Sequence, residues 1–227
     1  MLTHFLTFGG GASNFHDAAK RVSKEAIISG IFSTVHCYLD KDLEEMPDFW
    51  LAHGHFIKNN KRLYGYCIWK SYLVLKTLET MKEGDRLFYA DSGCQFDFDC
   101  EDPKSQYETM LEHMGDQIMS ATYCNTDYNM TKRDLVVHLN MEDHPRLKSR
   151  QIQTTTFLLK KCERIMNFVR LWYVMCCNYH FIDDSPSKLP NHSNYDEHRH
   201  EQSVFSLLAK KLDIYDPGED YDKCSIE

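Results

Sequence analysis

The sequence predicts a single α/β domain in which helices flank a mainly parallel sheet. Three observations carry this prediction. Apolar strand-like runs alternate with amphipathic helical stretches, the 227 residues fit one domain, and no linker or internal repeat divides the chain. Strands joined through helices form right-handed crossovers, which favours parallel pairing. We expect the domain over residues 1–212 and an acidic C-terminal tail over 213–227.

The first half of the chain predicts strands and helices in turn. An apolar run ends in three glycines, and Ser13 is expected to cap the amphipathic helix that follows. A later helical stretch is apolar around most of its circumference, so we expect it to be buried behind the sheet as a crossover helix. The expected strands are 4–8, 35–39 and 85–91, and the expected helices are 13–26 and 65–81.

The second half predicts further helices around one more strand. Pro103 is expected to open a polar-faced helix, and Thr131 with Asp134 to cap a short helix that ends at Leu139. A β-branched apolar run then predicts a strand, and a loop rich in Pro, Asn and Ser comes before the last helix. The expected helices are 104–121, 131–139, 163–180 and 199–212, the strand is 154–159, and the loop is 183–195.

Composition and charge narrow the class of protein. The 42% apolar and 26% charged residues are typical of a globular chain. A net charge of −8 gives no general attraction for nucleic acid or an anionic membrane, so we expect no nucleic-acid partner. The longest apolar run, 165–177, is too short to span a bilayer. Nine cysteines, with no C-x-x-C pair and no basic N-terminal region, favour free thiols in a reducing, cytoplasmic compartment.

Two strand ends are candidate ligand sites, because ligands of open α/β sheets bind beyond the carboxyl ends of the strands. At Phe8-Gly9-Gly10 the two glycines carry no side chains, so the backbone can approach a nucleotide or phosphate. A tight turn explains the glycines equally. At Asp91-Ser92 an apolar strand delivers a carboxylate and a hydroxyl, which suit Mg²⁺ or Mn²⁺. The alternative is an aspartate that caps a turn.

Several stretches together resemble a known family. Tyr64 to Tyr72, Gly84-Asp85 and Tyr89 to Cys94 are similar to GT-A type glycosyltransferases of large algal DNA viruses. The segments 149–153, 183–186 and 197–203 look like the same family, so the resemblance covers about residues 3 to 212. It implies a Rossmann-like GT-A domain with Mn²⁺ or Mg²⁺ at an Asp-x-Asp-like strand end. The second place of that motif holds Ala90 or Gly93 here, so Ser92, a water or a distant histidine would complete the metal shell beside Asp91.

The resemblance also implies roles for individual residues. Glu201 and Gln202 open the last helix and would face the anomeric carbon, whereas Glu201 alone is also explained as a charge that complements the helix dipole. Lys70 either extends to the surface or enters the crevice to pair with phosphate or Asp91. Tyr64 would stack on the base or belong to the core, and Arg150 would pair with the diphosphate or with a site carboxylate. His198 and His200 are expected to donate to the diphosphate, with metal ligands or surface residues as the alternatives. Gln153 is expected on the acceptor side.

The function implied is transfer of a sugar from a nucleoside diphosphate sugar, with UDP favoured, to a glycan, glycoprotein or other hydroxyl acceptor. The reaction would be metal-assisted, would favour retention, and would serve glycan biosynthesis in the cytoplasm, the host cytoplasm if the chain is viral. Two other functions stay open. A nucleotidyltransferase shares the layout but needs two metals and several close carboxylates, and a non-catalytic nucleotide-sugar binding module would tolerate the incomplete metal motif.

Overall fold

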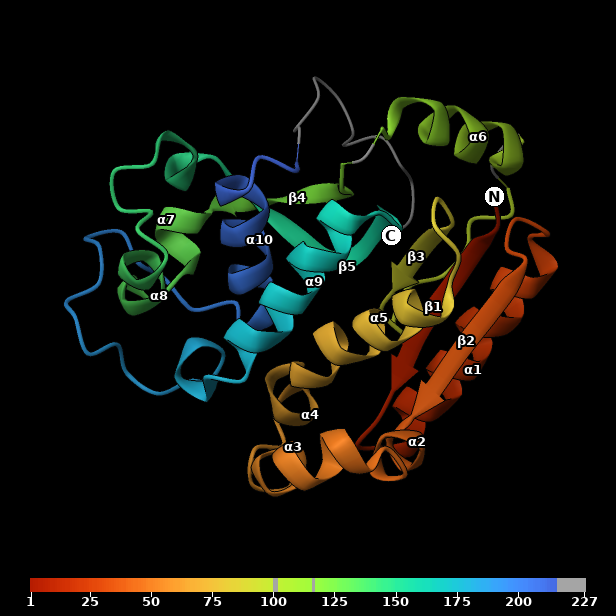
Figure 1. Ribbon diagram of the computed structural model, residues 1–227. Helices are drawn as coiled ribbons and strands as arrows, with labels where there is room; N and C mark the ends of the chain where they lie inside the picture. The colour runs from red at the N-terminus through yellow and green to blue at the C-terminus, as the bar shows by residue number, and fades with distance from the viewer. Residues whose placement is uncertain (100–101, 116, 216–227) are drawn as a thin grey trace.

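A computed structural model describes residues 1–99, 102–115 and 117–215, and in these residues a five-stranded sheet forms the centre of one α/β domain (Figure 1). The strand order is β2-β1-β3-β5-β4. The strands are β1 (Thr3–Gly9), β2 (Thr34–Leu39), β3 (Arg86–Ala90), β4 (Met119–Thr126) and β5 (Arg150–Lys160).

The sheet is mixed, where we expected it to be mainly parallel. Strand β1 pairs in parallel with both β2 and β3, and these three strands follow the expected crossover pattern. Strand β5 pairs antiparallel with both β3 and β4. A buried apolar strand has the same composition in either direction, so the pattern of 154–159 predicted the strand without its direction.

Ten α-helices and two short 3₁₀ turns are assigned within the described residues. The helices are α1 (Ser13–Ile28), α2 (Asp40–Glu44), α3 (Pro47–Asn59), α4 (Leu63–Tyr66), α5 (Ile68–Thr80), α6 (Pro103–His113), α7 (Asp127–Met130), α8 (Arg133–His138), α9 (Glu163–Cys176) and α10 (Glu201–Lys211). The 3₁₀ turns are η1 (Pro145–Lys148) and η2 (Tyr179–Phe181).

The predicted helix over 104–121 was wrong in its second half. Helix α6 ends at His113, and Gly115 follows with a φ of 53°, in the left-handed region that ends helices. Residues 119–126 form the edge strand β4, whose residues are mostly half-buried and show no clean alternation that would mark a strand. The helix predicted over 163–180 ends earlier, at Cys176.

Both predicted serine and threonine caps were also wrong. Ser13 is the first residue of α1, and Ala12 stands in the capping position without a side-chain hydrogen bond. Lys132, and not Thr131, precedes α8. The start of α1 therefore has no side-chain cap. The start of α8 is capped from a distant loop, because Oδ1 of Asn191 accepts from the N–H of Arg133 at 3.0 Å.

Two apolar layers cover the two faces of the sheet. Alternate residues of the central strands point to opposite sides, as the period of two requires. On one side Leu6, Leu87 and Leu159 belong to the larger core under α5, α9 and α10. On the other side Phe5, Phe88 and Leu158 pack with α1. Figure 1 shows α5 and α9 in front of the sheet and α1 behind it.

The chain beyond α10 still packs on the domain where it is described. Ile214 and Tyr215 are buried, and Ile118 N–H donates to the carbonyl of Ile214 at 2.8 Å. The rest of the predicted acidic tail, 216–227, lies outside the described residues. Among the described helices, none combines the length and the apolar character that crossing a membrane requires.

Candidate functional site

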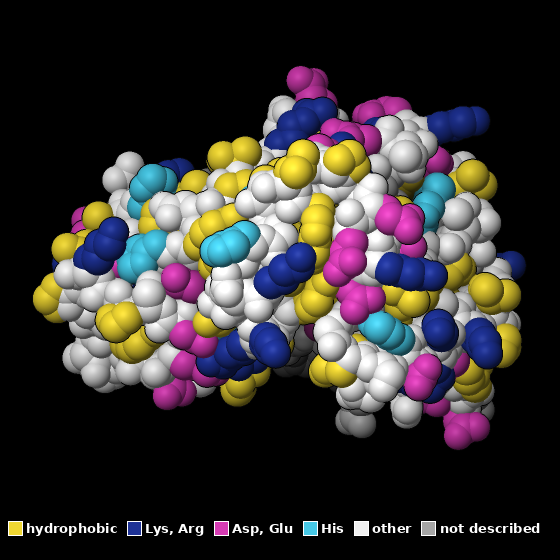
Figure 2. Space-filling model, turned by 90° about the horizontal axis from the view of Figure 1, so that it is seen from below, with side chains coloured by type: hydrophobic (Ala, Val, Ile, Leu, Met, Phe, Trp, Pro, Cys, Tyr) yellow, Lys and Arg dark blue, Asp and Glu magenta, His cyan; other side chains and the backbone are white. Residues whose placement is uncertain are grey.

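A cleft of about 740 Å³ opens at the carboxyl ends of β1, β2 and β3. Because these three strands are parallel, their ends meet at one edge of the sheet, beside α2, α3 and α4 (Figure 1). Figure 2 views this end of the molecule and shows acidic and basic side chains interspersed with hydrophobic ones. The cleft is lined by Phe8, Gly10, Gly11, Ala12, Phe15, Asp40, Glu44, Trp50, Ile57, Lys58, Lys61, Leu63, Tyr64, Cys67, Trp69, Asp91, Ser92 and Gly93.

The glycine turn after β1 allows close packing on both of its sides. A Cβ on Gly9 would lie 2.2 Å from the carbonyl oxygen of Phe15 and 2.8 Å from Cβ of Ala19, so only glycine lets α1 approach the strand end. A Cβ on Gly10 would lie 2.5 Å from the ring of Phe8. The tight turn and the cleft floor are therefore made by the same residues, and the two explanations of the glycines do not exclude each other.

Aromatic rings form one wall of the cleft. The ring centroids of Phe8 and Trp69 are 4.0 Å apart, and those of Phe8 and Tyr64 are 5.7 Å apart. Burial, followed by the negative charges of Asp40 and Glu44, raises the pKa of Tyr64, so its hydroxyl stays protonated at neutral pH. The wall offers flat apolar surface and a hydroxyl donor, which suits a nucleobase or a sugar ring.

The segment that carries Tyr64 has an unusual backbone. Five consecutive residues, Leu63 to Cys67, have φ between 50° and 78°, and only one of them is glycine. Each L-residue in this left-handed region costs about 1–2 kcal/mol. A Cβ on Gly65 would lie 2.6 Å from Cγ1 of Ile57, so this turn also packs closely on α3. Such strain persists only where the surrounding structure enforces it, and here it brings Tyr64 to the cleft.

Lys70 joins two predicted site carboxylates beneath the cleft. Its Nζ lies 3.0 Å from Oδ1 of Asp91 and 3.1 Å from Oε1 of Glu201, and it donates to the carbonyl of Thr154 at 3.0 Å. An ammonium has three hydrogens, and these three oxygens match them. Tyr89 donates its hydroxyl to the same Oδ1 of Asp91 at 2.6 Å.

The ammonium of Lys70 stays charged in this position. Burial opposes its charge, but the carboxylates of Asp91 and Glu201 outweigh burial and raise the pKa of Lys70. The side chain of Lys70 is 3% exposed and that of Glu201 4%, whereas Asp91 is 38% exposed and faces the cleft. One cation therefore stands between a buried and an accessible carboxylate. Of the two open predictions for Lys70, pairing with Asp91 is the one observed.

Glu201 and Gln202 face the interior at the start of α10. Glu201 accepts a hydrogen bond from Oγ1 of Thr154 at 2.8 Å in addition to its contact with Lys70. The amide of Gln202 accepts from the backbone N–H of Thr154 at 3.2 Å and donates to Oε1 of Gln151 at 2.8 Å. Both side chains tie α10 to β5, and Glu201 reaches the cleft through Lys70 and Asp91.

A buried polar network continues behind Gln202. Gln151 donates to Oδ1 of Asp127 at 2.9 Å, and Ser206 and Lys210 contact Oδ2 of the same carboxylate at 2.8 and 2.5 Å. Burial raises the pKa of Asp127, although Lys210 acts in the opposite direction. This network holds α7, β5 and α10 together and was not anticipated from the sequence.

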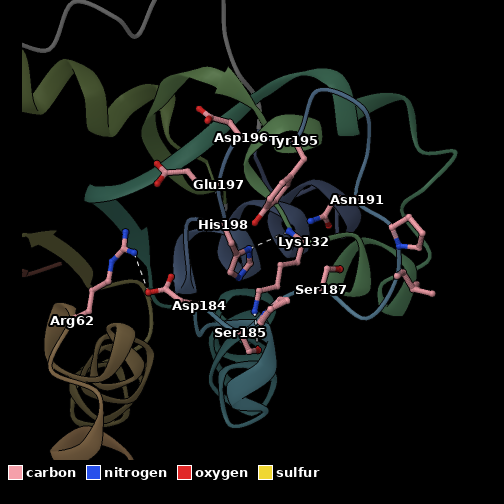
Figure 3. A pocket seen from close by; sticks show the side chains of 13 residues that line it. Arg62, Lys132, Asp184, Ser185, Ser187, Asn191, Tyr195, Asp196, Glu197 and His198 are labelled. Atoms are coloured by element: carbon pink, nitrogen blue, oxygen red, sulfur yellow. Dashed lines mark hydrogen bonds and ion pairs between the residues drawn. The ribbon is translucent and has the colours of Figure 1, made fainter.

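A second, more polar pocket of about 520 Å³ lies beside the first, and Figure 3 shows its side chains. Arg62 lines this pocket, and the next residue, Leu63, lines the cleft, so the left-handed turn separates the two hollows. Arg62 pairs with Asp184 at 3.0 Å across the pocket edge (Figure 3). The lining also includes Lys132, Ser185, Asn191, Tyr195, Asp196, Glu197 and His198.

The two predicted phosphate histidines are buried. His198 donates from Nε2 to the carbonyl of Phe181 at 2.7 Å, and its Nδ1 accepts from the N–H of Lys132 at 3.2 Å. Burial lowers the pKa of His198 to about 3, so the ring is neutral at physiological pH. His200 contacts the carbonyl of Ile182 through Nδ1 at 2.8 Å, and burial lowers its pKa as well. His198 lines the second pocket, and neither histidine lines the cleft.

Two predicted residues lie on β5 away from the cleft lining. Arg150 is exposed at the first position of β5, and its carbonyl accepts from Lys210 at 2.8 Å. Gln153 donates to the carbonyl of Thr122 on the edge strand at 3.1 Å. The structure thus gathers Phe8, Gly10, Tyr64, Asp91 and Ser92 at the cleft, with Gly9, Lys70 and Glu201 directly behind them.

The fit of a divalent cation depends on Asp91 and Ser92. In the described part of the chain, no three His, Cys, Asp or Glu residues are grouped so as to hold a metal ion. Oδ1 of Asp91 already contacts the ammonium of Lys70 and accepts a hydrogen bond from the hydroxyl of Tyr89, whereas Oδ2 makes neither of these contacts. Mg²⁺ is often bound through one or two carboxylates with substrate phosphates and water as further ligands. The residues present fit a cation of this substrate-completed kind.

Four charged residues of the cleft were missed from the sequence. Asp40 directly follows β2, and its Oδ2 lies 3.1 Å from Nε2 of His16 and accepts from the N–H of Gly11 at 3.3 Å. The strand-end rule that selected Asp91 applies to Asp40 equally. Glu44, Lys58 and Lys61 follow on helices and turns, where a single charged residue gives no comparable signal.

Comparisons with known proteins give little further information. No protein-family model matches the chain, and no curated protein matches its sequence. Among solved structures, the chain is similar to mouse xyloside xylosyltransferase 1 in its apo form. The identity is 12%, the TM-score is 0.44, and the match covers 91% of this chain and 81% of that chain. A similarity at this level carries no argument about family or function.

Proposed function

We propose that this protein is a glycosyltransferase that takes a nucleoside diphosphate sugar, with UDP favoured, into the cleft at the ends of β1, β2 and β3. The observation that carries the proposal is Asp91, an accessible strand-end carboxylate fixed by Lys70 and placed in one cleft with a glycine turn and an aromatic wall. Glycine turns admit phosphates and aromatic rings bind bases, so the cleft combines what a nucleotide sugar requires.

In this proposal Mn²⁺ or Mg²⁺ would be held by Asp91 and Ser92 together with the donor diphosphate. The metal would neutralise the charge that develops on the leaving diphosphate. The protein's own contribution is to fix the carboxylate of Asp91, because the ammonium of Lys70 and the hydroxyl of Tyr89 both bind Oδ1. A fixed carboxylate needs no reorganisation when the donor binds.

Glu201 would act as a positioning residue in this site. Its carboxylate is 4% exposed and contacts Lys70, which in turn contacts Asp91. Loss of Glu201 would therefore alter the placement of Asp91 without removing a contact to the donor. The direct role of Glu201 and Gln202 at the anomeric carbon stays a prediction, and the present burial of both side chains argues for the indirect role.

The second pocket is the proposed place for the acceptor. Its lining combines carboxylates, an amide, hydroxyls and the ring of Tyr195, which are the groups that hydrogen-bond and stack on sugars. It adjoins the donor cleft across the turn between Arg62 and Leu63. A glycan or glycoprotein sugar bound there would approach a donor across this turn.

A nucleotidyltransferase is the second candidate, because Asp40, Glu44 and Asp91 all line the same cleft. These carboxylates do not form a metal-holding group within the described residues, which disfavours the two-metal site that such an enzyme needs. A non-catalytic nucleotide-sugar binding module would share the cleft and lack turnover.

One assay separates the three functions. The protein is incubated with a panel of nucleotide sugars, and separately with nucleoside triphosphates and sugar phosphates, with and without Mn²⁺. Release of nucleoside diphosphate supports the glycosyltransferase, release of pyrophosphate supports the nucleotidyltransferase, and binding without either supports the module. In Asp91→Asn we expect turnover to fall at least about 100-fold with an unchanged melting temperature. Glu83→Gln, at the opposite end of β3, is the matched control and should keep full turnover.

A further inference from the structure

One face of helix α3 and the turn that follows the helix line the cleft, and together they carry two cations. Trp50, Ile57 and Lys58 line the cleft from α3 at spacings of seven and eight residues, which place them on one side of the helix. Lys61 lines the cleft from the turn that follows the helix end at Asn59. A Cβ on Gly54 would lie 2.9 Å from the Trp50 ring, so the glycine lets this ring lie flat on the helix. Nζ of Lys58 lies 5.4 Å from the centroid of the same ring, a cation–π contact.

Lys58 and Lys61 are the only cationic side chains among the described residues that line the cleft. No carboxylate within 1–99, 102–115 and 117–215 forms an ion pair with either of them. The neighbouring cations are engaged elsewhere. Lys70 has three oxygen acceptors, and Arg62 pairs with Asp184 outside the cleft.

A nucleoside diphosphate brings two to three negative charges into a cleft that already holds Asp40, Glu44 and Asp91. Such a ligand needs cationic partners that are accessible and not already neutralised. The buried histidines do not supply them, because burial lowers the pKa values of His198 and His200 and keeps both rings neutral. Lysine is a common phosphate ligand, acting as a point charge on a flexible stem.

We propose that Lys58 and Lys61 bind the diphosphate of the donor, with Lys58 held in place by the Trp50 ring. This inference rests on the proposed function, since the diphosphate is that of the nucleotide-sugar donor. It moves the phosphate-binding role from Lys70, Arg150, His198 and His200 to the wall of the cleft formed by α3 and the turn after it. Lys70 then holds Asp91 in place and does not contact the phosphate.

The test compares Lys58→Gln/Lys61→Gln with the wild type by titration calorimetry against UDP, uridine and inorganic pyrophosphate, at low and moderate salt. Lys20→Gln/Lys24→Gln removes two exposed lysines of α1 outside the cleft lining and is the matched control. We expect the cleft variant to lose about tenfold or more in affinity for UDP and pyrophosphate, with a weaker salt dependence, and the control to lose none. Uridine affinity should not change.

The possible failures are distinguishable. Wild-type affinity for UDP in the cleft variant overturns the inference and leaves the proposed function standing. In a second outcome the wild type binds pyrophosphate but no nucleoside diphosphate, and the cleft variant does not bind pyrophosphate. This outcome overturns the proposed function and supports a phosphate site at these lysines. Absence of both kinds of binding in the wild type overturns both. Because Lys58 also lies in the last turn of α3, Lys61→Gln alone is measured if the double variant melts early, and it should lose UDP affinity by several-fold.

Discussion

Lys70 should be a highly sensitive charged position, because it pairs with the buried carboxylate of Glu201, and Lys70→Met tests this. The substitution keeps the length of the side chain and removes the ammonium that lies 3.1 Å from Oε1 of Glu201. Glu201 is 4% exposed and would keep only the hydroxyl of Thr154 as a partner for that oxygen. Removal of one partner of a buried ion pair costs about 3–5 kcal/mol, a large part of the roughly 5–15 kcal/mol that stabilises a typical domain. Asp91 is exposed enough for water to screen it, so it adds little to this estimate.

The cost is predicted to fall when the stranded charge is removed as well. Glu201→Gln alone should cost about 1–3 kcal/mol, because the amide oxygen still accepts from Thr154 and Lys70 keeps Asp91. In Lys70→Met/Glu201→Gln no uncompensated buried charge remains, so the double variant should lose less than the sum of the single variants by about 0.5–3 kcal/mol. Urea unfolding followed by circular dichroism at neutral pH measures all three free energies.

Lys76→Met is the matched control for this cycle. Lys76 lies on the same helix, is 42% exposed and pairs with Asp48 at 3.0 Å, so its loss should cost less than about 1 kcal/mol. The reasoning would be refuted if Lys70→Met cost no more than Lys76→Met. It would also be refuted if the losses of the two single variants simply added in the double variant.

Two further predictions concern the strained turn and a buried histidine. Leu63 has a φ of 50° and is half exposed, so Leu63→Gly should keep the unfolding free energy or raise it by up to about 1 kcal/mol. Leu51→Gly, in the right-handed helix α3, should lower the unfolding free energy by about 1 kcal/mol. Equal losses for the two variants in urea unfolding would contradict the strain argument. The pKa of His198 falls from 6.5 to about 3 on folding, so between these pH values the ring is protonated in the unfolded chain and neutral in the folded chain. The free energy of unfolding therefore declines by up to about 1.4 kcal/mol per pH unit as the pH falls from 6.5 toward 3. His198→Gln should reduce the dependence of the unfolding free energy on pH between pH 6 and 4 by the contribution of about one proton, about 1.4 kcal/mol per pH unit. An unchanged pH dependence would show that His198 is not the group responsible.

The elements that local pattern determines were predictable from the sequence. Strands β1, β2 and β3 and helix α1 follow from apolar runs, glycine stops and helical spacing, and each lies within a few residues of its expected range. Strand β4 was missed because its residues are mostly half-buried at the sheet edge and give no period-two pattern. The direction of β5 could not be predicted from the sequence either, because it depends on the antiparallel pairing of β5 with β3.

The candidate site was predictable where it depends on strand ends and not where it depends on side-chain partners. Asp91 and the glycine turn follow from the strand-end rule, and the same rule should have selected Asp40. The contact between Lys70 and Glu201 joins α5 to α10 across most of the chain, and the third partner of Lys70 is a backbone carbonyl, which no sequence pattern identifies. Lys58 and Lys61 were missed because exposed lysines on a helix or turn usually have no specific role.

The position of Lys70 makes the two halves of the chain depend on each other at the cleft. Asp91 ends β3 in the first half, whereas Thr154 and Glu201 belong to β5 and α10 in the second, and one ammonium binds all three. A buried ion pair adds little net stability compared with apolar packing, so stability alone does not explain its presence. Its effect is to fix the accessible carboxylate of Asp91 relative to α10 and to the loop that forms the second pocket. The placement of a donor in the cleft and of an acceptor in the neighbouring pocket would then be set by the same three contacts. Substitutions at Glu201 should therefore change donor affinity even though its side chain lies outside the cleft lining.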